Sequence, residues 1–119
     1  MPGVNLAVVF AGAGLPRPER EYRFAEPRRF AFDLAWPEPY YVALEIEGGV
    51  FGKGKPCPLC NARPVAGHRS IDRFLRDMEK YNLAASMGWC IIRVLPEQLE
   101  SGEAVALVEN ALASRGWEP

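Results

Sequence analysis

The sequence predicts an α/β domain in which a small mixed sheet is flanked by helices. Residues 30–36 and 41–47 alternate apolar residues with small or acidic ones, as β-strands do. Residues 89–95 form a nearly continuous apolar run, which is typical of a buried strand. Apolar residues recur at three- and four-residue steps in 70–87 and 103–114, the period of an amphipathic helix. Strands followed by helix, strand and helix favour this class of fold.

The length of 119 residues predicts one domain, covering residues 1–119. A hydrophobic content of 49% and a charged content of 24% are typical of a soluble globular chain. The longest apolar stretch, residues 6–15, is too short to span a membrane, and no basic segment precedes it as in a secretory signal. We therefore expect a cytoplasmic protein without a membrane partner, and host cytoplasm if a phage encodes it. The net charge of −1 provides no overall attraction to nucleic acid.

The first half of the chain is expected to supply most strands. Residues 5–10 read as a short strand, and residues 19–24 as either a strand or an irregular lead-in. Strands 30–36 and 41–47 follow, joined by the Pro-rich turn 37–39. Phe30, Phe32, Leu34 and Trp36 should share one face of their strand because side chains alternate.

The second half begins with a Gly- and Pro-rich loop insertion at about 50–68. A helix is expected from Ser70, as its N-cap, to about Met87. Strand 89–95 ends at Pro96, a short turn follows, and the final helix covers 103–114. The apolar positions of the first helix define its inner face: Ile71, Phe74, Leu75, Met78, Tyr81 or Asn82, and Ala85.

Three carboxylates on the two alternating strands are the strongest chemical signal in the sequence. If the turn closes a hairpin, Asp33 and Glu45 lie roughly opposite each other, with Glu47 on the same side. Like charges that close repel each other unless a cation joins them. Hard oxygen ligands favour Mg²⁺ or Mn²⁺, so the pattern predicts a metal site.

The alternative is a half-solvated strand, which often alternates apolar with acidic residues. Ala31, Ala35 and Ala43 argue against it, because a solvated sheet face usually carries Thr, Lys or Arg. Alanines suit a sheet face that another group, of this protein or of a ligand, approaches closely. Gly48 and Gly49 would also permit close approach of the backbone.

Basic residues flank the acidic strands on both sides, which indicates either a basic groove around an acidic centre or scattered surface charge. Members of the two flanking groups are Arg17, Arg20, Arg23, Arg28 and Arg29, then Lys53, Lys55, Arg63, Arg69, Arg73 and Arg76. Arg69, Arg73, Arg76 and Lys80 also form one row on the expected helix.

Five segments in order resemble the PD-(D/E)XK nuclease superfamily, in particular the small phage and bacterial nucleases related to very short patch repair (Vsr-like) endonucleases. They are FDLAWP at 32–37, ALEIEGG at 43–49, GHR at 67–69, DMEKYN at 77–82 and GWCIIR at 88–93. The resemblance implies a restriction-endonuclease-like core of about four strands and metal-dependent hydrolysis of DNA phosphodiester bonds. Branched or mismatched DNA is one candidate substrate, in repair, recombination or phage DNA processing, and nicked DNA, a specific duplex site and single-stranded DNA stay open.

The resemblance also implies roles for the carboxylates. Asp33 and Glu45 would hold Mg²⁺ or Mn²⁺, with the Ile46 carbonyl as a third ligand. The lysine that names the superfamily is absent, and Glu47 occupies its position. Glu47 would accept a proton from the attacking water or bind a second metal. Glu21, in preference to Glu19, would replace an acid usual on the first helix.

Positive charge at the phosphate would come from Lys80, on the following helix, or from His68. Arg29, Arg69, Arg73 and Arg76 are the expected DNA contacts. A homodimer is expected if both strands of a duplex are cut. The alternative is a catalytically inactive nucleic-acid-binding or zinc-clasped assembly protein with a nuclease-like core, since the missing lysine would explain lost activity.

Cys57 and Cys60 have the C-x-x-C spacing of a zinc knuckle in a Gly- and Pro-rich setting. A structural Zn²⁺ needs four ligands, so His68 or a second chain would have to complete the site. A disulfide and inert free thiols are the other interpretations. Cys90 lies in the expected buried strand and reads as a core residue.

Overall fold

The computed structural model describes residues 5–47 and 64–119, with the backbone alone for 64–70. Its centre is a four-stranded mixed sheet in the order β1-β2-β3-β4. The strands are β1 (Glu19–Arg23), β2 (Ala31–Trp36), β3 (Val42–Ile46) and β4 (Cys90–Val94). β1–β2 and β2–β3 pair antiparallel, and β3–β4 pair parallel. The predicted α/β class, a mixed sheet flanked by helices, is confirmed.

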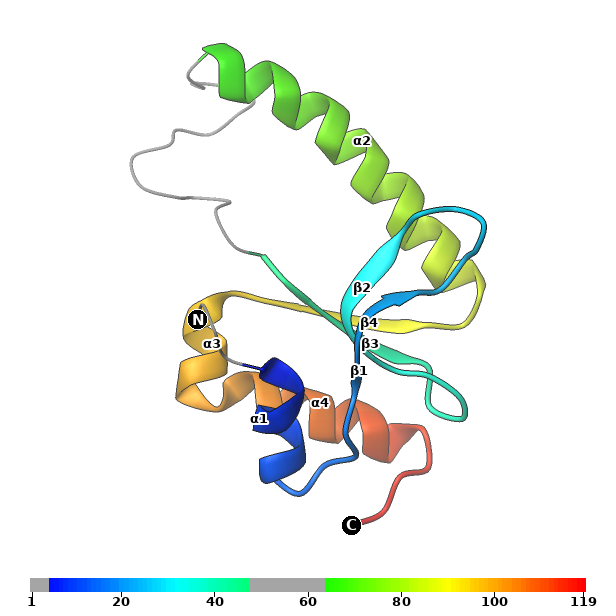
Figure 1. The fold of residues 1–119 in the computed structure, drawn as a ribbon, viewed down its shortest axis with the longest axis vertical. Coiled ribbons are helices and arrows are strands. Elements are labelled where there is room, and N and C mark those ends of the chain that lie inside the picture. Colours follow the sequence, from blue (N-terminus) through cyan, green and yellow to red (C-terminus); the bar gives the residue numbers. More distant parts are fainter. Residues whose placement is uncertain (1–4, 48–63) are drawn as a thin grey trace.

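Helices cover both faces of this sheet (Figure 1). One face carries α1 (Leu6–Gly12), α3 (Pro96–Ser101) and α4 (Glu103–Ser114), and the other carries α2 (Pro64–Ser86). The larger core lies under the three helices and includes Phe10, Leu44 and Leu112, all fully buried. The smaller core lies under α2 and is built on Phe24, Phe32 and Trp89.

The N-terminal segment is a helix, so the predicted strand at 5–10 is wrong. Asn5 caps α1, because its side-chain oxygen accepts the N–H of Ala7 at 3.0 Å. Ala7 and Phe10, three residues apart, are buried against the sheet. A short apolar run cannot by itself distinguish strand from helix.

The alternation predicted for residues 30–36 holds only from Leu34 onward. Leu34 and Trp36 pack in the larger core, whereas Phe32 packs with Phe24 and Trp89 in the smaller one. The prediction that these side chains share one face is therefore wrong for Phe32 and for Phe30, which also packs against the smaller core. The change coincides with an irregularity in β1, where Glu21 has a φ of 48° and is skipped in the pairing with β2.

Helix α2 covers the sheet face that carries Ala35 and Ala43. Ala35 and Ala43 are fully buried in one cluster with Ala84 of α2. Small residues at these positions let the helix pack closely on the sheet. The close approach that the alanines indicated is thus made by the protein itself.

Helix α2 begins at Pro64, so the predicted helix boundary at Ser70 and the Gly67–Arg69 turn are wrong. Of the expected loop insertion at about 50–68, residues 64–68 are helical and the remainder up to residue 63 lies outside the described residues. The helix stops before Gly88, whose φ of 94° suits a C-terminal glycine.

The predicted inner face of α2 is largely exposed. Four of its apolar side chains are 44–57% exposed: Ile71, Phe74, Leu75 and Met78. Figure 1 shows the reason, since only the C-terminal part of α2 lies over the sheet while the rest extends beyond it. Ala84 is the buried residue of that C-terminal part.

The last third of the chain follows the sequence pattern closely. β4 matches the predicted strand to one residue at each end, and α4 has the predicted bounds. Within β4, the prediction that this strand is buried is wrong except at Val94, because β4 is an edge of the sheet. In place of the expected short turn, Pro96 opens helix α3, since proline is tolerated in a first helical turn. No described helix combines the length and apolar character needed to cross a membrane.

Candidate active site

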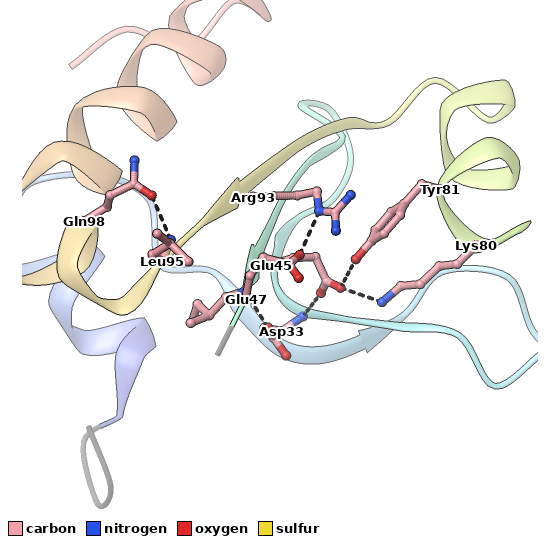
Figure 2. A network of polar contacts seen from close by, with 9 residues as sticks. Asp33, Glu45, Glu47, Lys80, Tyr81, Arg93, Leu95 and Gln98 are labelled. Carbon is pink, nitrogen blue, oxygen red and sulfur yellow. Dashed lines mark hydrogen bonds and ion pairs between the residues drawn. The ribbon is translucent and has the colours of Figure 1, made fainter. Parts of the chain in front are cut away.

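The candidate site lies where β2 and β3 stop pairing. Their ladder runs from Trp36 and Val42 to Leu34 and Leu44 and ends there. At the next position the side chains replace the ladder. The N–H of Asp33 donates to Glu45 Oε2 at 2.8 Å, and the N–H of Ile46 donates to Asp33 Oδ2 at 2.8 Å (Figure 2). Two acids of neighbouring strands are thereby fixed beside each other.

Glu45 is the buried charge of this site, with 7% of its surface exposed. Its Oε1 accepts hydrogen bonds from Lys80 Nζ at 2.6 Å and from the Tyr81 hydroxyl at 2.8 Å. Both donors come from α2 and point toward the sheet (Figure 2). A buried carboxylate is costly unless it is paired and hydrogen-bonded, and Glu45 meets both conditions.

Asp33 reaches solvent, but its carboxyl group is partly desolvated, and this makes its charged form unfavourable. Burial of its carboxyl raises its pKa above 3.8, and the charge of Glu45 raises it further, while the N–H of Ile46 and Lys80 oppose the shift. The two carboxylates are therefore close enough to repel each other, as expected of a pair that a cation would join.

Glu47 faces a different partner. Its Oε2 accepts a hydrogen bond from Arg93 Nε at 2.7 Å. This bond raises the pKa of Arg93 further above its already high value. In the part of the chain with described side chains, no three His, Cys, Asp or Glu side chains gather as metal ligands.

The donor set fits a divalent metal held by two carboxylates. Mg²⁺ commonly takes one or two protein carboxylates and completes its shell with water and substrate phosphate. Asp33 and Glu45 supply two such oxygens at the open end of the β2–β3 ladder. The structure pairs Glu47 with Arg93, and the charge of Glu47 also helps to raise the pKa of Asp33.

Glu21 lies on the strand beside Asp33, since its neighbours Arg20 and Tyr22 pair with Leu34 and Phe32, the neighbours of Asp33. Both line a hollow of about 250 Å³ together with Arg20 and Ile46. The acid chosen from the sequence to replace one on the first helix is thus near Asp33. Helix α1 itself contains no acidic residue.

A groove of about 500 Å³ separates the start of β2 from α2. Its basic side chains are Arg29, Arg73, Arg76 and Lys80, and its remaining lining is Phe30, Ala31, Asp72 and Asp77. Lys80 belongs to this groove and also contacts Glu45, so the groove reaches the carboxylates. Three of the four arginines expected to bind DNA therefore meet in one place.

The remaining predicted residues cannot be placed at the site. His68 and Arg69 belong to α2, in the part where only the backbone is described. Cys57 and Cys60, with the zinc interpretations that depend on them, lie outside the described residues. Cys90 is half-buried against the larger core.

Two residues of the site were not singled out from the sequence for chemistry. Tyr81 reads as a core residue by its helical position, yet its hydroxyl binds Glu45. Arg93 follows an apolar run, and only the parallel register, which pairs it with Glu45, reveals that it lies beside the acidic strand. For Tyr81, the sequence offered one sign of a role at the site, its position directly after Lys80.

Comparison of this chain with models of protein families, with curated proteins and with solved structures finds no match.

Proposed function

We propose that the protein is a metal-dependent endodeoxyribonuclease that hydrolyses phosphodiester bonds, acting on branched or mismatched DNA in repair, recombination or phage DNA processing. The observation that carries the proposal is the contact between Lys80 and Glu45. It joins an acidic pair at the end of a strand ladder to a groove that also carries Arg29, Arg73 and Arg76.

The positions of these side chains indicate a separate role for the arginines, the carboxylates and Lys80. The arginines of the groove bind the phosphodiester backbone, and their fixed charges hold one phosphate near the carboxylates. When bound by Asp33 and Glu45, Mg²⁺ or Mn²⁺ supplies Lewis acidity and activates water. Lys80 provides an ammonium group that stabilises negative charge developing on the phosphate. A lysine from α2 thereby compensates for the glutamate at position 47.

A catalytically inactive DNA-binding protein is the second candidate. One observation favours it: Glu47 is occupied by Arg93, so neither a lysine nor a free carboxylate is available at that position. A homodimer in the cytoplasm completes the proposal, with the dimer required if both strands of a duplex are cut.

Cleavage assays test the proposal and separate the two candidates. Wild type, Asp33→Asn and Lys80→Met are incubated with plasmid, flap and four-way-junction DNA in Mg²⁺, Mn²⁺ or EDTA. Glu38→Gln, in the exposed turn between β2 and β3, is the matched carboxylate control. We expect metal-dependent cleavage by wild type and Glu38→Gln, and none by Asp33→Asn. DNA binding without cleavage in either metal would select the inactive protein instead.

A further inference from the structure

The two oxygens of Glu45 accept hydrogen bonds from two different elements, β2 and α2. Oε2 accepts from the backbone of Asp33 at 2.8 Å, and Oε1 accepts from Lys80 and from the Tyr81 hydroxyl. The rotation of this carboxylate is therefore set from both sides. Lys80 also lines the groove, where a phosphate would compete with Glu45 for its ammonium. Tyr81 does not line the groove, so a phosphate bound there would not compete for its hydroxyl. The hydrogen bond from Tyr81 to Glu45 would therefore persist when Lys80 turns to the phosphate.

Tyr81 is itself held by a chain of contacts that leads back to β3. The guanidinium of Arg93 lies 4.5 Å from the centre of the Tyr81 ring. Arg93 in turn donates to Glu47 at 2.7 Å. The contacts run from Glu47 through Arg93 and Tyr81 to Glu45, as Figure 2 shows. Three elements, β3, β4 and α2, thus fix one hydroxyl.

The hydroxyl of Tyr81 donates to Oε1 of Glu45 at 2.8 Å. This contact acts on the carboxylate that the proposed cation would bind. The geometry therefore assigns to Tyr81 the orientation of Glu45.

We propose that Tyr81 is a positioning residue that, supported by Arg93 and Glu47, holds Glu45 in the orientation in which it shares a divalent cation with Asp33. The inference rests on the proposed function. It also gives Glu47 a role in this chain that needs no contact with metal, since its carboxylate anchors Arg93. Partners that orient metal ligands typically affect metal affinity about 10- to 100-fold.

Metal affinity tests the inference without reference to cleavage. Binding of Mn²⁺ to the full-length protein is measured by isothermal titration calorimetry for wild type and Tyr81→Phe. This substitution keeps the ring and the net charge and removes only the hydroxyl. Tyr41→Phe is the matched control, because Tyr41 is exposed and packs on Trp89 away from the acids. We expect the Kd to rise about tenfold in Tyr81→Phe and to stay unchanged in Tyr41→Phe.

Arg93→Met separates positioning from simple electrostatics. Removing a positive charge beside two acids should strengthen cation binding if only charge matters. If Arg93 acts through Tyr81, binding should weaken instead. Circular dichroism melts confirm that each variant is folded. Equal affinity in Tyr81→Phe and wild type, or tighter binding in Arg93→Met, would overturn the inference.

The outcomes also distinguish this inference from the proposed function. If wild type binds Mn²⁺ and Tyr81→Phe binds it more weakly, positioning is supported even when no DNA substrate is cut. If wild type cleaves DNA and Tyr81→Phe binds Mn²⁺ equally well, only the inference fails. A folded wild type that binds no Mn²⁺ would overturn both.

Discussion

The backbone N–H of Asp33 donates to Oε2 of Glu45 at 2.8 Å, in the place where the next rung of the β2–β3 ladder would be. An ordinary antiparallel pair would use main-chain groups at this position and leave both carboxylates free to rotate. Here a side chain satisfies the backbone of the opposite strand, and Asp33 does the same for Ile46. The end of the ladder therefore orders both acids at once.

The Lys80–Glu45 pair should be energetically coupled. Its side chains are 13% and 9% exposed, so removing one charge leaves the other in a poorly solvated place. We expect Lys80→Met and Glu45→Gln each to lower the free energy of unfolding by about 3 kcal/mol. The double variant should lose less than the sum, with a coupling above about 1 kcal/mol. Urea denaturation measures all three.

Arg28 and Glu79 offer an exposed pair of similar geometry as the control. Their contact is also 2.6 Å, but the side chains are 47% and 55% exposed. Glu79→Gln should cost less than about 1 kcal/mol. Additive losses in the Lys80–Glu45 cycle would mean that the buried pair contributes no more than this surface pair.

Asp33→Asn should stabilise the metal-free protein at neutral pH while abolishing metal binding. Because the pKa of Asp33 is raised above 3.8 by folding, its charged form is less favourable in the folded state than in the unfolded chain. This cost is absent at pH values below 3.8 and develops as the pH rises through the raised pKa. Asparagine still accepts a hydrogen bond from Ile46 and carries no charge.

Thermal melts in EDTA between pH 3 and 8 give the comparison. The melting temperature of Asp33→Asn should exceed that of wild type at pH 7, and the difference should shrink toward the acidic end. Added Mn²⁺ should then raise the melting temperature of wild type alone. A difference that stays constant across this pH range would contradict the assigned electrostatic cost.

Arg73 and Arg76 should contribute to DNA affinity through phosphate contacts. Both line the groove with Arg29 and Lys80. Each of Arg73→Gln and Arg76→Gln should weaken binding to all sequences alike and reduce the salt-dependence slope by about 1. Fluorescence anisotropy at several salt concentrations in EDTA measures this. Arg17→Gln, at an exposed position that does not line the groove, should leave the slope unchanged.

Gly88→Ala should destabilise the protein through its backbone alone. Gly88 has a φ of 94°, and a Cβ at this position would meet no atom within 4 Å. The left-handed conformation costs a non-glycine residue about 1–2 kcal/mol. The melting temperature should fall accordingly by roughly 4 °C for each kcal/mol in a domain of this size.

Gly12→Ala provides the opposite case. Gly12 is the last residue of α1 and has equally open surroundings, without a positive φ. Alanine should therefore be neutral or slightly stabilising there. A loss in Gly12→Ala as large as that in Gly88→Ala would mean that the backbone conformation is not the cause.

Local pattern was sufficient for much of the fold. The bounds of the strands around Asp33 and Glu45 follow closely from two-residue alternation, although the faces of β2 hold only from Leu34 onward. Helix α4 follows from its apolar stripe, because that signal lies within a few neighbouring residues. Helix α1 escaped detection because its apolar run is too short to show a period, and only the Asn5 cap decides the matter.

Features that depend on distant contacts could not be read in the same way. Exposure of Phe74 and Leu75 depends on where α2 leaves the sheet, which no local period specifies. The contacts of Arg93 with Glu47 and Tyr81 depend on the β3–β4 register. A sequence motif identified Lys80 as a candidate residue. The contact of its ammonium with Glu45 could not be predicted, because it depends on how α2 packs on the sheet.

Three methyl groups set the separation between helix and sheet in this protein. Ala84 and the two strand residues Ala35 and Ala43 are fully buried together, and Lys80 lies one helical turn before Ala84. The position of that ammonium relative to Glu45 therefore depends on the side-chain volume at these three positions. Exchanging one of these alanines for glycine or valine would tune the spacing in small steps. The contact between Lys80 and Glu45 could thus be adjusted, by selection or by design, without altering a single ionisable residue.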